Sequence, residues 1–356
     1  MRWILTIGLF ILFAIPYSTP TLSQSEPDFL IIRHTERVTY AQWSADSSRI
    51  LTTSEDGKIR MSDSQRGNML WERTGDNPIA GASWSANEKL IIAWDTDGEV
   101  LLIHAGTGNM LDKNNSQIQH AIWKSDSTAV MMYSPNILNI SSVQDSQFGG
   151  GLFALETPDT ILFAQWNTDE TQILTFHESG NATIWDVASG DKIGSYRFPE
   201  GTTGIAWSAN GDQFVSWGQE NIVTQWNISP TGDIVQVRDF RHNRTFIIGA
   251  KWVMNDNQLL TWGADETARI WDVTSGTELV SVYHTDWVTG ATLNQDGTRL
   301  VTWSYQSAYI WNAQTGDLFY QAPHDNLVSG ASLNADETRL LTWGWDGKAR
   351  VWGAGQ

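Results

Sequence analysis

A unit of about 41 residues recurs eight times along the chain, and this repeat constrains the fold more than any other feature. Each unit starts at an apolar anchor followed by a short polar turn; the anchors are Trp43, Trp84, Trp123, Trp166, Trp207, Trp252, Leu293 and Leu333. The turns are rich in Asn, Asp, Gly and Ser, which satisfy tight turns with their own side chains or tolerate positive φ. The repeat therefore predicts an array of similar structural units.

Each unit contains sequence for four short strands. In the sixth unit an apolar run at 258–262 follows the anchor turn, another lies at 268–272, and a last run at 278–283 closes the unit. Four strands of four to seven residues in one such period are typical of a blade of a β-propeller. We therefore expect an all-β fold over residues 24–356, a single eight-bladed β-propeller of four-stranded antiparallel blades, with seven blades as the alternative.

Residues 1–23 have the pattern of an export signal. Arg2 supplies a positive charge, an almost wholly apolar run covers 4–15, and small residues stand at Thr21 and Ser23. This run is too short to span a bilayer, which needs about 20 apolar residues. We expect a signal peptide over 1–23 with cleavage near Ser23, no membrane insertion of the mature chain, and a secreted or periplasmic location.

The charge balance and the absence of cysteine exclude several function classes. The chain has 22 Lys plus Arg against 40 Asp plus Glu, a net charge of −18, whereas nucleic-acid binding needs a positive surface. With no Cys there is no disulfide framework, no thiolate nucleophile and no zinc–thiolate site. We expect no nucleic-acid partner.

A second tryptophan series carries a family resemblance. Trp-Asp stands at 185–186 and 271–272, with the near variants Trp-Asn at 226–227 and 311–312 and Trp-Gly at 352–353. In register with the anchors, these dipeptides make residues 28–353 resemble the WD-repeat family. An exported member of this family is expected to be bacterial, because its eukaryotic members are mostly intracellular. The resemblance implies the fold and says little about function, because the fold hosts many roles.

The resemblance also implies a hydrogen-bonded tetrad of His, Ser or Thr, Asp and Trp in each well-formed blade. Two blades have all four residues: His242, Thr261, Asp265 and Trp271 in blade six, and His324, Thr342, Asp346 and Trp352 in blade eight. In blade one Ser62 replaces the Trp, and in blade seven Gln306 replaces the Asp. Blades four and five lack the His, and blades two and three lack nearly the whole set. We expect these histidines to be structural rather than metal ligands.

Ring closure is expected to use the start of the mature chain. The last unit stops at Trp352 after its third strand, and an apolar run at 28–33 precedes the first unit. The family commonly pairs such a terminal strand into the last blade. That pairing would complete the eighth blade and leave no open sheet edge, which favours eight blades over seven.

No sequence signature of catalysis is present. The chain lacks Gly-x-Ser-x-Gly, His-Glu-x-x-His and a phosphate-binding glycine loop. Asp95-Thr-Asp97-Gly98 lacks most calcium ligands and is interpreted as a tight turn, and His177-Glu178 as a surface pair. We therefore expect no catalytic residues, no metal and no cofactor.

The remaining aromatic residues divide into two groups. Trp94, Trp217, Trp262, Trp303 and Trp343 repeat in the second strand, where blade-to-blade packing explains them. Trp287, Tyr305 and Trp345 lie in turns outside the repeat pattern, near Asp286 and Asp325. Exposed aromatics on adjacent blades would form a contact patch for a protein or peptide whose apolar anchors are flanked by basic residues.

Two function classes follow. The favoured hypothesis is a non-catalytic, monomeric scaffold that binds a protein or peptide outside the cytoplasm. The alternative is a periplasmic quinoprotein-like propeller, either an oxidoreductase or an envelope-assembly scaffold. The segment 63–71 is similar to the blade motif of quinoprotein propellers, although their usual vicinal Cys pair is absent.

Overall fold

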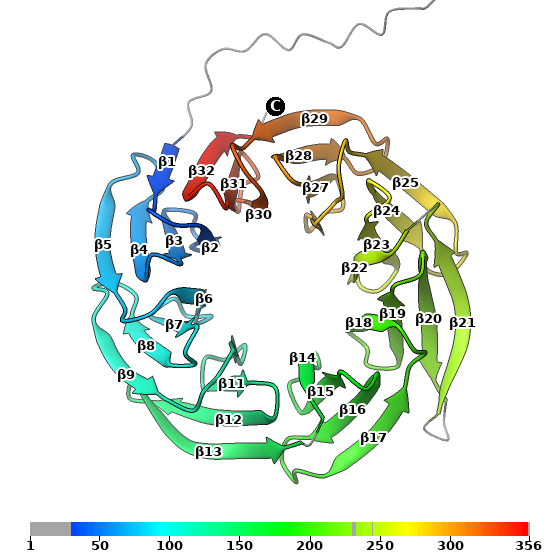
Figure 1. The fold of residues 1–356 in the computed structure, drawn as a ribbon, viewed down its shortest axis with the longest axis horizontal. Helices are drawn as coiled ribbons and strands as arrows, with labels where there is room; N and C mark the ends of the chain where they lie inside the picture. Colours follow the sequence, from blue (N-terminus) through cyan, green and yellow to red (C-terminus); the bar gives the residue numbers. More distant parts are fainter. Residues whose placement is uncertain (1–29, 158, 230–232, 244, 355–356) are drawn as a thin grey trace, which may run out of the picture.

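The computed structural model describes residues 30–157, 159–229, 233–243 and 245–354, so the expected signal peptide at 1–23 lies outside the described residues. The described residues form eight four-stranded antiparallel sheets arranged as blades around a ring (Figure 1). This arrangement confirms the predicted eight-bladed, all-β propeller.

In each of blades one to seven, four consecutive strands pair in order from the centre to the rim (Figure 1). Blades one to three contain β2 (Val38–Trp43), β3 (Arg49–Ser54), β4 (Lys58–Asp63), β5 (Met69–Thr74); β6 (Ile79–Trp84), β7 (Leu90–Asp95), β8 (Val100–His104), β9 (Met110–Asn114); β10 (His120–Trp123), β11 (Ala129–Tyr133), β12 (Ile137–Gln144), β13 (Gln147–Glu156). Blades four and five contain β14 (Ile161–Trp166), β15 (Gln172–His177), β16 (Asn181–Asp186), β17 (Lys192–Arg197); β18 (Thr202–Trp207), β19 (Gln213–Gly218), β20 (Ile222–Ile228), β21 (Ile234–Arg241). Blades six to eight contain β22 (Ile247–Val253), β23 (Gln258–Gly263), β24 (Thr267–Asp272), β25 (Glu278–Tyr283); β26 (Gly290–Leu293), β27 (Arg299–Trp303), β28 (Ser307–Asn312), β29 (Leu318–Pro323); β30 (Val328–Leu333), β31 (Arg339–Gly344), β32 (Lys348–Gly353).

Blade eight takes its outer strand from the other end of the chain. The strand β1 (Leu30–Arg33) pairs antiparallel with β32, with Ile32 opposite Ala349. Ile32 is buried in a cluster that contains Val351 and residues of blade one. The expected closure is therefore confirmed for residues 30–33; Phe29 lies outside the described residues.

The second-strand tryptophans pack between blades, as expected. Trp343 belongs to a cluster with Val38 and Ala41 of blade one, and its ring contacts Tyr40 edge-on at 5.9 Å. Each tryptophan of this series lies directly opposite a glycine of the first strand; the pairs are Gly81–Trp94, Gly204–Trp217, Gly249–Trp262, Gly290–Trp303 and Gly330–Trp343. A Cβ atom on any of these glycines would lie within 2.1–2.4 Å of the indole Cζ2. The glycines are therefore required for the tryptophans to fit.

The turns after the anchors link neighbouring blades. At five junctions a backbone N–H of one turn donates to a side chain of the next blade's turn, and that side chain belongs to a residue with positive φ. The pairs are Ala335 to Ser47, Ala45 to Glu88, Asn87 to Ser127, Ser125 to Glu170 and Asn210 to Asp256. We call this side of the ring the anchor-turn face, and the opposite side, where the chain enters each blade, the entry face.

In the part of the chain that the structure describes, no helix has the length and apolarity needed to cross a membrane.

Candidate functional site

The tetrad residues of blade six form one hydrogen-bonded chain. Trp271 Nε1 donates to Thr261 Oγ1 at 2.8 Å, the Thr261 hydroxyl lies 2.8 Å from His242 Nε2, and His242 Nδ1 lies 3.0 Å from Asp265. Burial alone would raise the pKa of the Asp265 carboxyl, but the hydrogen bonds from His242 and Thr267 and the nearby positive charge of Arg269 together outweigh burial and hold that pKa at about 2. The tetrad thus satisfies buried polar groups beneath the entry face.

The blade-eight tetrad has an additional member. His324 Nε2 lies 2.7 Å from Thr342 Oγ1, which also accepts the Trp352 N–H at 2.8 Å. The Arg350 guanidinium lies between His324 Nδ1 and Asp346, at 2.8 and 2.6 Å. Its charge and the hydrogen bond from His324 together keep the pKa of the Asp346 carboxyl well below its usual range, against the effect of burial.

Blade four contains a histidine partner that the sequence analysis missed. His177 was interpreted as part of a surface pair, but it is buried, and its Nε2 lies 2.9 Å from Thr175 Oγ1. Trp185 Nε1 donates to the same oxygen at 3.0 Å. The surface interpretation of His177 was therefore wrong. This histidine follows Thr175 within β15, whereas the family motif places the histidine before the first strand.

In blade seven, only one of the two ring nitrogens of the tetrad histidine has a hydrogen-bond partner among the described residues. His284 Nε2 lies 2.8 Å from Thr302 Oγ1, but His284 Nδ1 is buried with no hydrogen-bond partner among the described residues. The β27–β28 turn is one residue shorter than the β23–β24 turn, and it has no acid equivalent to Asp265. Burial lowers the pKa of His284 to about 4. Because this value lies below that of an unfolded histidine, about 6.5, the stability that neutral His284 provides is complete above pH 6.5 and is lost as the pH falls toward 4.

We expect Gln306→Asp to reduce this acid sensitivity. The variant places a carboxylate in the turn beside His284, and a carboxylate that accepts from His284 Nδ1 would raise the pKa of His284. Urea unfolding at about pH 5 should show a gain of roughly 1.5–3 kcal/mol over the parent, the range for hydrogen bonds to charged groups. Gln314→Asp, which adds the same charge on an exposed turn, is the control; an equal effect from both variants would contradict the tetrad explanation.

The three aromatics singled out in the sequence are all exposed. Trp287, Tyr305 and Trp345 expose 50%, 47% and 48% of their surface. Trp287 lies in the segment that enters blade seven, whereas Tyr305 and Trp345 lie in the β27–β28 and β31–β32 turns. The Val328 N–H donates to the Tyr305 carbonyl and the Trp345 N–H donates to the Leu327 carbonyl, so both turns flank the segment that enters blade eight.

Two further residues extend this surface. Phe246, 39% exposed, packs edge-on against Trp287 with ring centroids 5.3 Å apart. At the other end the Arg37 guanidinium lies 5.0 Å from the centroid of the Trp345 ring and pairs with Glu55 at 2.8 Å. We call Phe246, Trp287, Tyr305 and Trp345 the aromatic arc; it spans blades six to eight on the entry face.

The two acids expected near the arc differ in availability. Asp286 is exposed and its Oδ1 accepts only the backbone N–H of Trp287 among the hydrogen bonds described. Asp325 already pairs with Lys348 at 2.5 Å and with Arg350 at 3.0 Å. Asp286 is therefore the more available acid for a basic partner residue.

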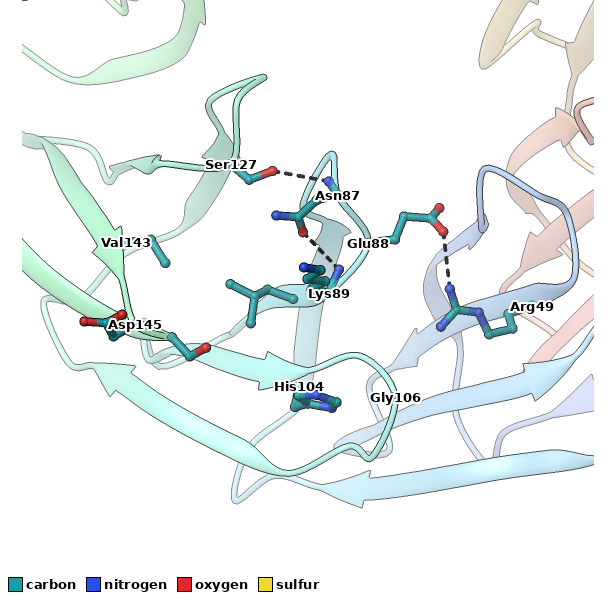
Figure 2. Close-up of a pocket in the computed structure, with 11 residues that line it drawn as sticks. Arg49, Asn87, Glu88, Lys89, His104, Gly106, Ser127, Val143 and Asp145 are labelled. Carbon is teal, nitrogen blue, oxygen red and sulfur yellow. Dashed lines mark hydrogen bonds and ion pairs between the residues drawn. The ribbon is translucent and has the colours of Figure 1, made fainter.

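A hollow of about 540 Å³ opens on the anchor-turn face between blades two and three (Figure 2). In blades one, two, six and seven, the turn between the third and fourth strands lies against the outer strand of the preceding blade, as where Gly108 packs on Trp71. In blade three this turn consists of Asp145 and Ser146 alone, both at positive φ, and it is too short to fill the space. Lys89, His104, Ser127 and Asp145 are among the residues that line the hollow.

The remaining motifs have structural explanations. Asp95 is buried, and its carboxylate accepts from the backbone N–H groups of Asp97 and Glu99, which is the expected tight turn. In segment 63–71, the Asp63 carboxylate accepts from the backbone of Arg66 in the same way, and Trp71 donates to Ala105 O at 2.9 Å. No group of three or more His, Asp or Glu that could hold a metal occurs among the described residues.

Comparisons with known proteins agree with this geometry. The family model described as WD domain, G-beta repeat, matches residues 27–63, which include β1 and the first three strands of blade one. Similar solved structures include Saccharomyces cerevisiae Sqt1, with a TM-score of 0.77, 13% identity, and coverage of 92% of this chain and 98% of that chain. The C-terminal WD40 domain of Sif2 has a TM-score of 0.74 and 15% identity, with coverage of 91% of this chain and 98% of that chain. The computationally designed Ika8 protein has a TM-score of 0.75 and 18% identity, with coverage of 90% of this chain and 97% of that chain. No curated protein matches the sequence. The fold is thus a WD40-type β-propeller.

Proposed function

We propose that this protein is a non-catalytic scaffold that binds a protein or peptide through the aromatic arc. The observation that carries the proposal is the exposure of Phe246, Trp287, Tyr305 and Trp345 on adjacent blades, because aromatic anchors dominate the energetics of protein interfaces. WD40-type propellers are generally protein-interaction scaffolds, which supports the same function. Binding through the arc would require only non-covalent contacts with the partner.

The partner that fits has apolar anchors flanked by Lys or Arg. The Arg37 guanidinium lies near the Trp345 ring, which illustrates how an exposed indole of the arc pairs with a cation. Asp286 offers a carboxylate beside Trp287, and the net charge of −18 attracts a basic segment. The proposal places this interaction outside the cytoplasm, in a bacterial host, on the basis of the signal pattern at 1–23. Intact-mass measurement of the native protein tests that location, and a retained Met1 would contradict it.

Truncating the arc should weaken binding while leaving the fold intact. We expect Trp287→Ala and Trp345→Ala each to weaken the partner by about 2 kcal/mol or more, because central aromatic anchors cost this much when removed. The partner would be captured from the native envelope by cross-linking and its affinity measured by calorimetry. Phe319→Ala, an equally exposed aromatic on the outer strand β29, is the matched control. A lower melting temperature with unchanged affinity would show that the two tryptophans serve folding instead.

A further inference from the structure

The outer strand of blade three differs from every other outer strand that the structure describes. β13 has nine consecutive uncharged residues, Gln147 to Leu155, whereas the other outer strands have at most six. Proteins usually protect exposed edges with charges, prolines or short strands, because an unpaired edge is a template for another strand. β13 lies on the rim of the ring with only β12 beside it in the sheet (Figure 1).

Backbone groups of β13 face outward without a strand partner. The Thr157 N–H donates to the Asn136 carbonyl, so the antiparallel alternation directs the N–H groups of Leu155 and Phe153 toward β12. The N–H and C=O groups of Ala154 and Glu156 therefore point away from the blade. The first two residues of β13 are covered differently, because Phe148 N–H donates to the Asp112 carboxylate of blade two.

Side chains along this edge leave room for a second backbone. Leu152 is 57% exposed, and Gly150 and Gly151 are exposed beside it. A Cβ atom on either glycine would meet nothing within 4 Å, and neither glycine has a positive φ, so the chain's own structure does not require them. Glycine in a strand is suited to the close approach of another backbone.

We propose that β13 pairs antiparallel with β13 of a second copy of this chain, which joins two blades into one continuous sheet across a two-fold axis. A net charge of −18 makes two copies repel each other over most of their surfaces, and the uncharged stretch of β13 is where that repulsion is weakest. Pairing about Ala154 places Glu156 of one copy opposite Leu152 of the other, so no like charges meet. The contact is self-complementary, as a two-fold interface requires.

This dimer departs from the monomer expected from the sequence alone, and it is independent of the proposed scaffold function. β13 belongs to blade three on the rim, whereas the aromatic arc lies on the entry face of blades six to eight (Figure 1). Both copies would keep their arcs accessible.

Analytical ultracentrifugation of the purified protein over a wide concentration range tests the proposal. We expect the parent to double its mass with rising concentration. Leu152→Lys, which adds a charge to the edge, and Ala154→Pro, which removes an outward N–H, should both abolish this doubling. Leu318→Lys adds the same charge at an exposed leucine of β29 and should leave the dimer unchanged.

Hydrogen exchange of the parent provides a second measurement that needs no substitution. The amides of Ala154 and Glu156 should exchange fast in dilute solution and become protected at dimer-forming concentrations. A parent that stays monomeric throughout would overturn the proposal. So would a dimer that survives both β13 substitutions, or one that forms without new protection at Ala154 and Glu156, because either result would place the interface elsewhere.

Discussion

Deleting residues 24–33 should lower the free energy of unfolding by about 3–6 kcal/mol. The deletion removes the buried Ile32 and the partly buried Leu30 and Ile31 from the junction of blades eight and one. Full burial of one such side chain contributes roughly 1.5–3 kcal/mol, and the two partly buried side chains together count as about one more. It also leaves β32 as an open edge beside exposed apolar residues. Because domains are stable by only about 5–15 kcal/mol, the loss should lower the melting temperature markedly and promote aggregation.

Single substitutions in β1 test whether the buried side chain of this strand, rather than its backbone pairing alone, provides the stability. Ile32→Ala should reproduce part of the loss, because Ile32 is buried, whereas Arg33→Ala, at an exposed side chain of the same strand, should have little effect. Thermal unfolding followed by circular dichroism measures all three variants. A deletion variant that melts within about a degree or two of the parent and stays soluble would show that β1 does not hold the ring closed.

Gly330→Ala should destabilise the ring through a single methyl group. The added Cβ would lie 2.2 Å from Trp343 Cζ2, and the indole is buried between blades eight and one. Overpacking of this kind costs about 1–3 kcal/mol, because the side chain must leave its preferred rotamer or the strands must separate. Gly353→Ala is the matched control, because its Cβ would meet nothing within 4 Å. Denaturant unfolding of both variants measures the difference.

A double-mutant cycle assigns the cost to the indole. Trp343→Leu removes the clashing ring and leaves a cavity, so it is destabilising alone. If the clash is the cause, Gly330→Ala should cost almost nothing in the Trp343→Leu background, a coupling of about 1 kcal/mol or more. Additive effects would show instead that Gly330 is needed for its backbone conformation.

The ring architecture was predictable because its determinants are local and repeated. The anchors end the first strand of their blades almost without exception, and the turns after them follow from Asn, Asp, Gly and Ser. The eighth blade was predictable from the missing fourth strand after Trp352 and the apolar run before His34. The sequence also singled out the arc tryptophans, because they fall outside the positions that the repeat uses for packing.

The contacts that could not be predicted from the sequence depend on the three-dimensional positions of side chains, which the repeat spacing does not give. The interpretation of His177 failed because this histidine reaches Thr175 from within the same strand, a spacing that the family motif does not contain. The pairing of Asp325 with Lys348 and Arg350 bridges segments of one blade in a way that spacing alone does not reveal. Phe246 joins the arc through contact with Trp287, although its own position in the sequence carries no distinguishing signal.

The sharing of blade eight between the two ends of the chain determines when folding can finish. Of the strands that the structure describes, β1 is synthesised first and its partner β32 last, so β1 has no partner while seven blades form. Throughout that interval, the apolar faces of blades one and seven lack one neighbour. Among the described strand pairs, the pairing of β1 with β32, which places Leu30 opposite Val351, closes the longest loop, so it should be the slowest pairing to form. The chain is therefore most vulnerable to aggregation in the interval before β32 becomes available to pair with β1.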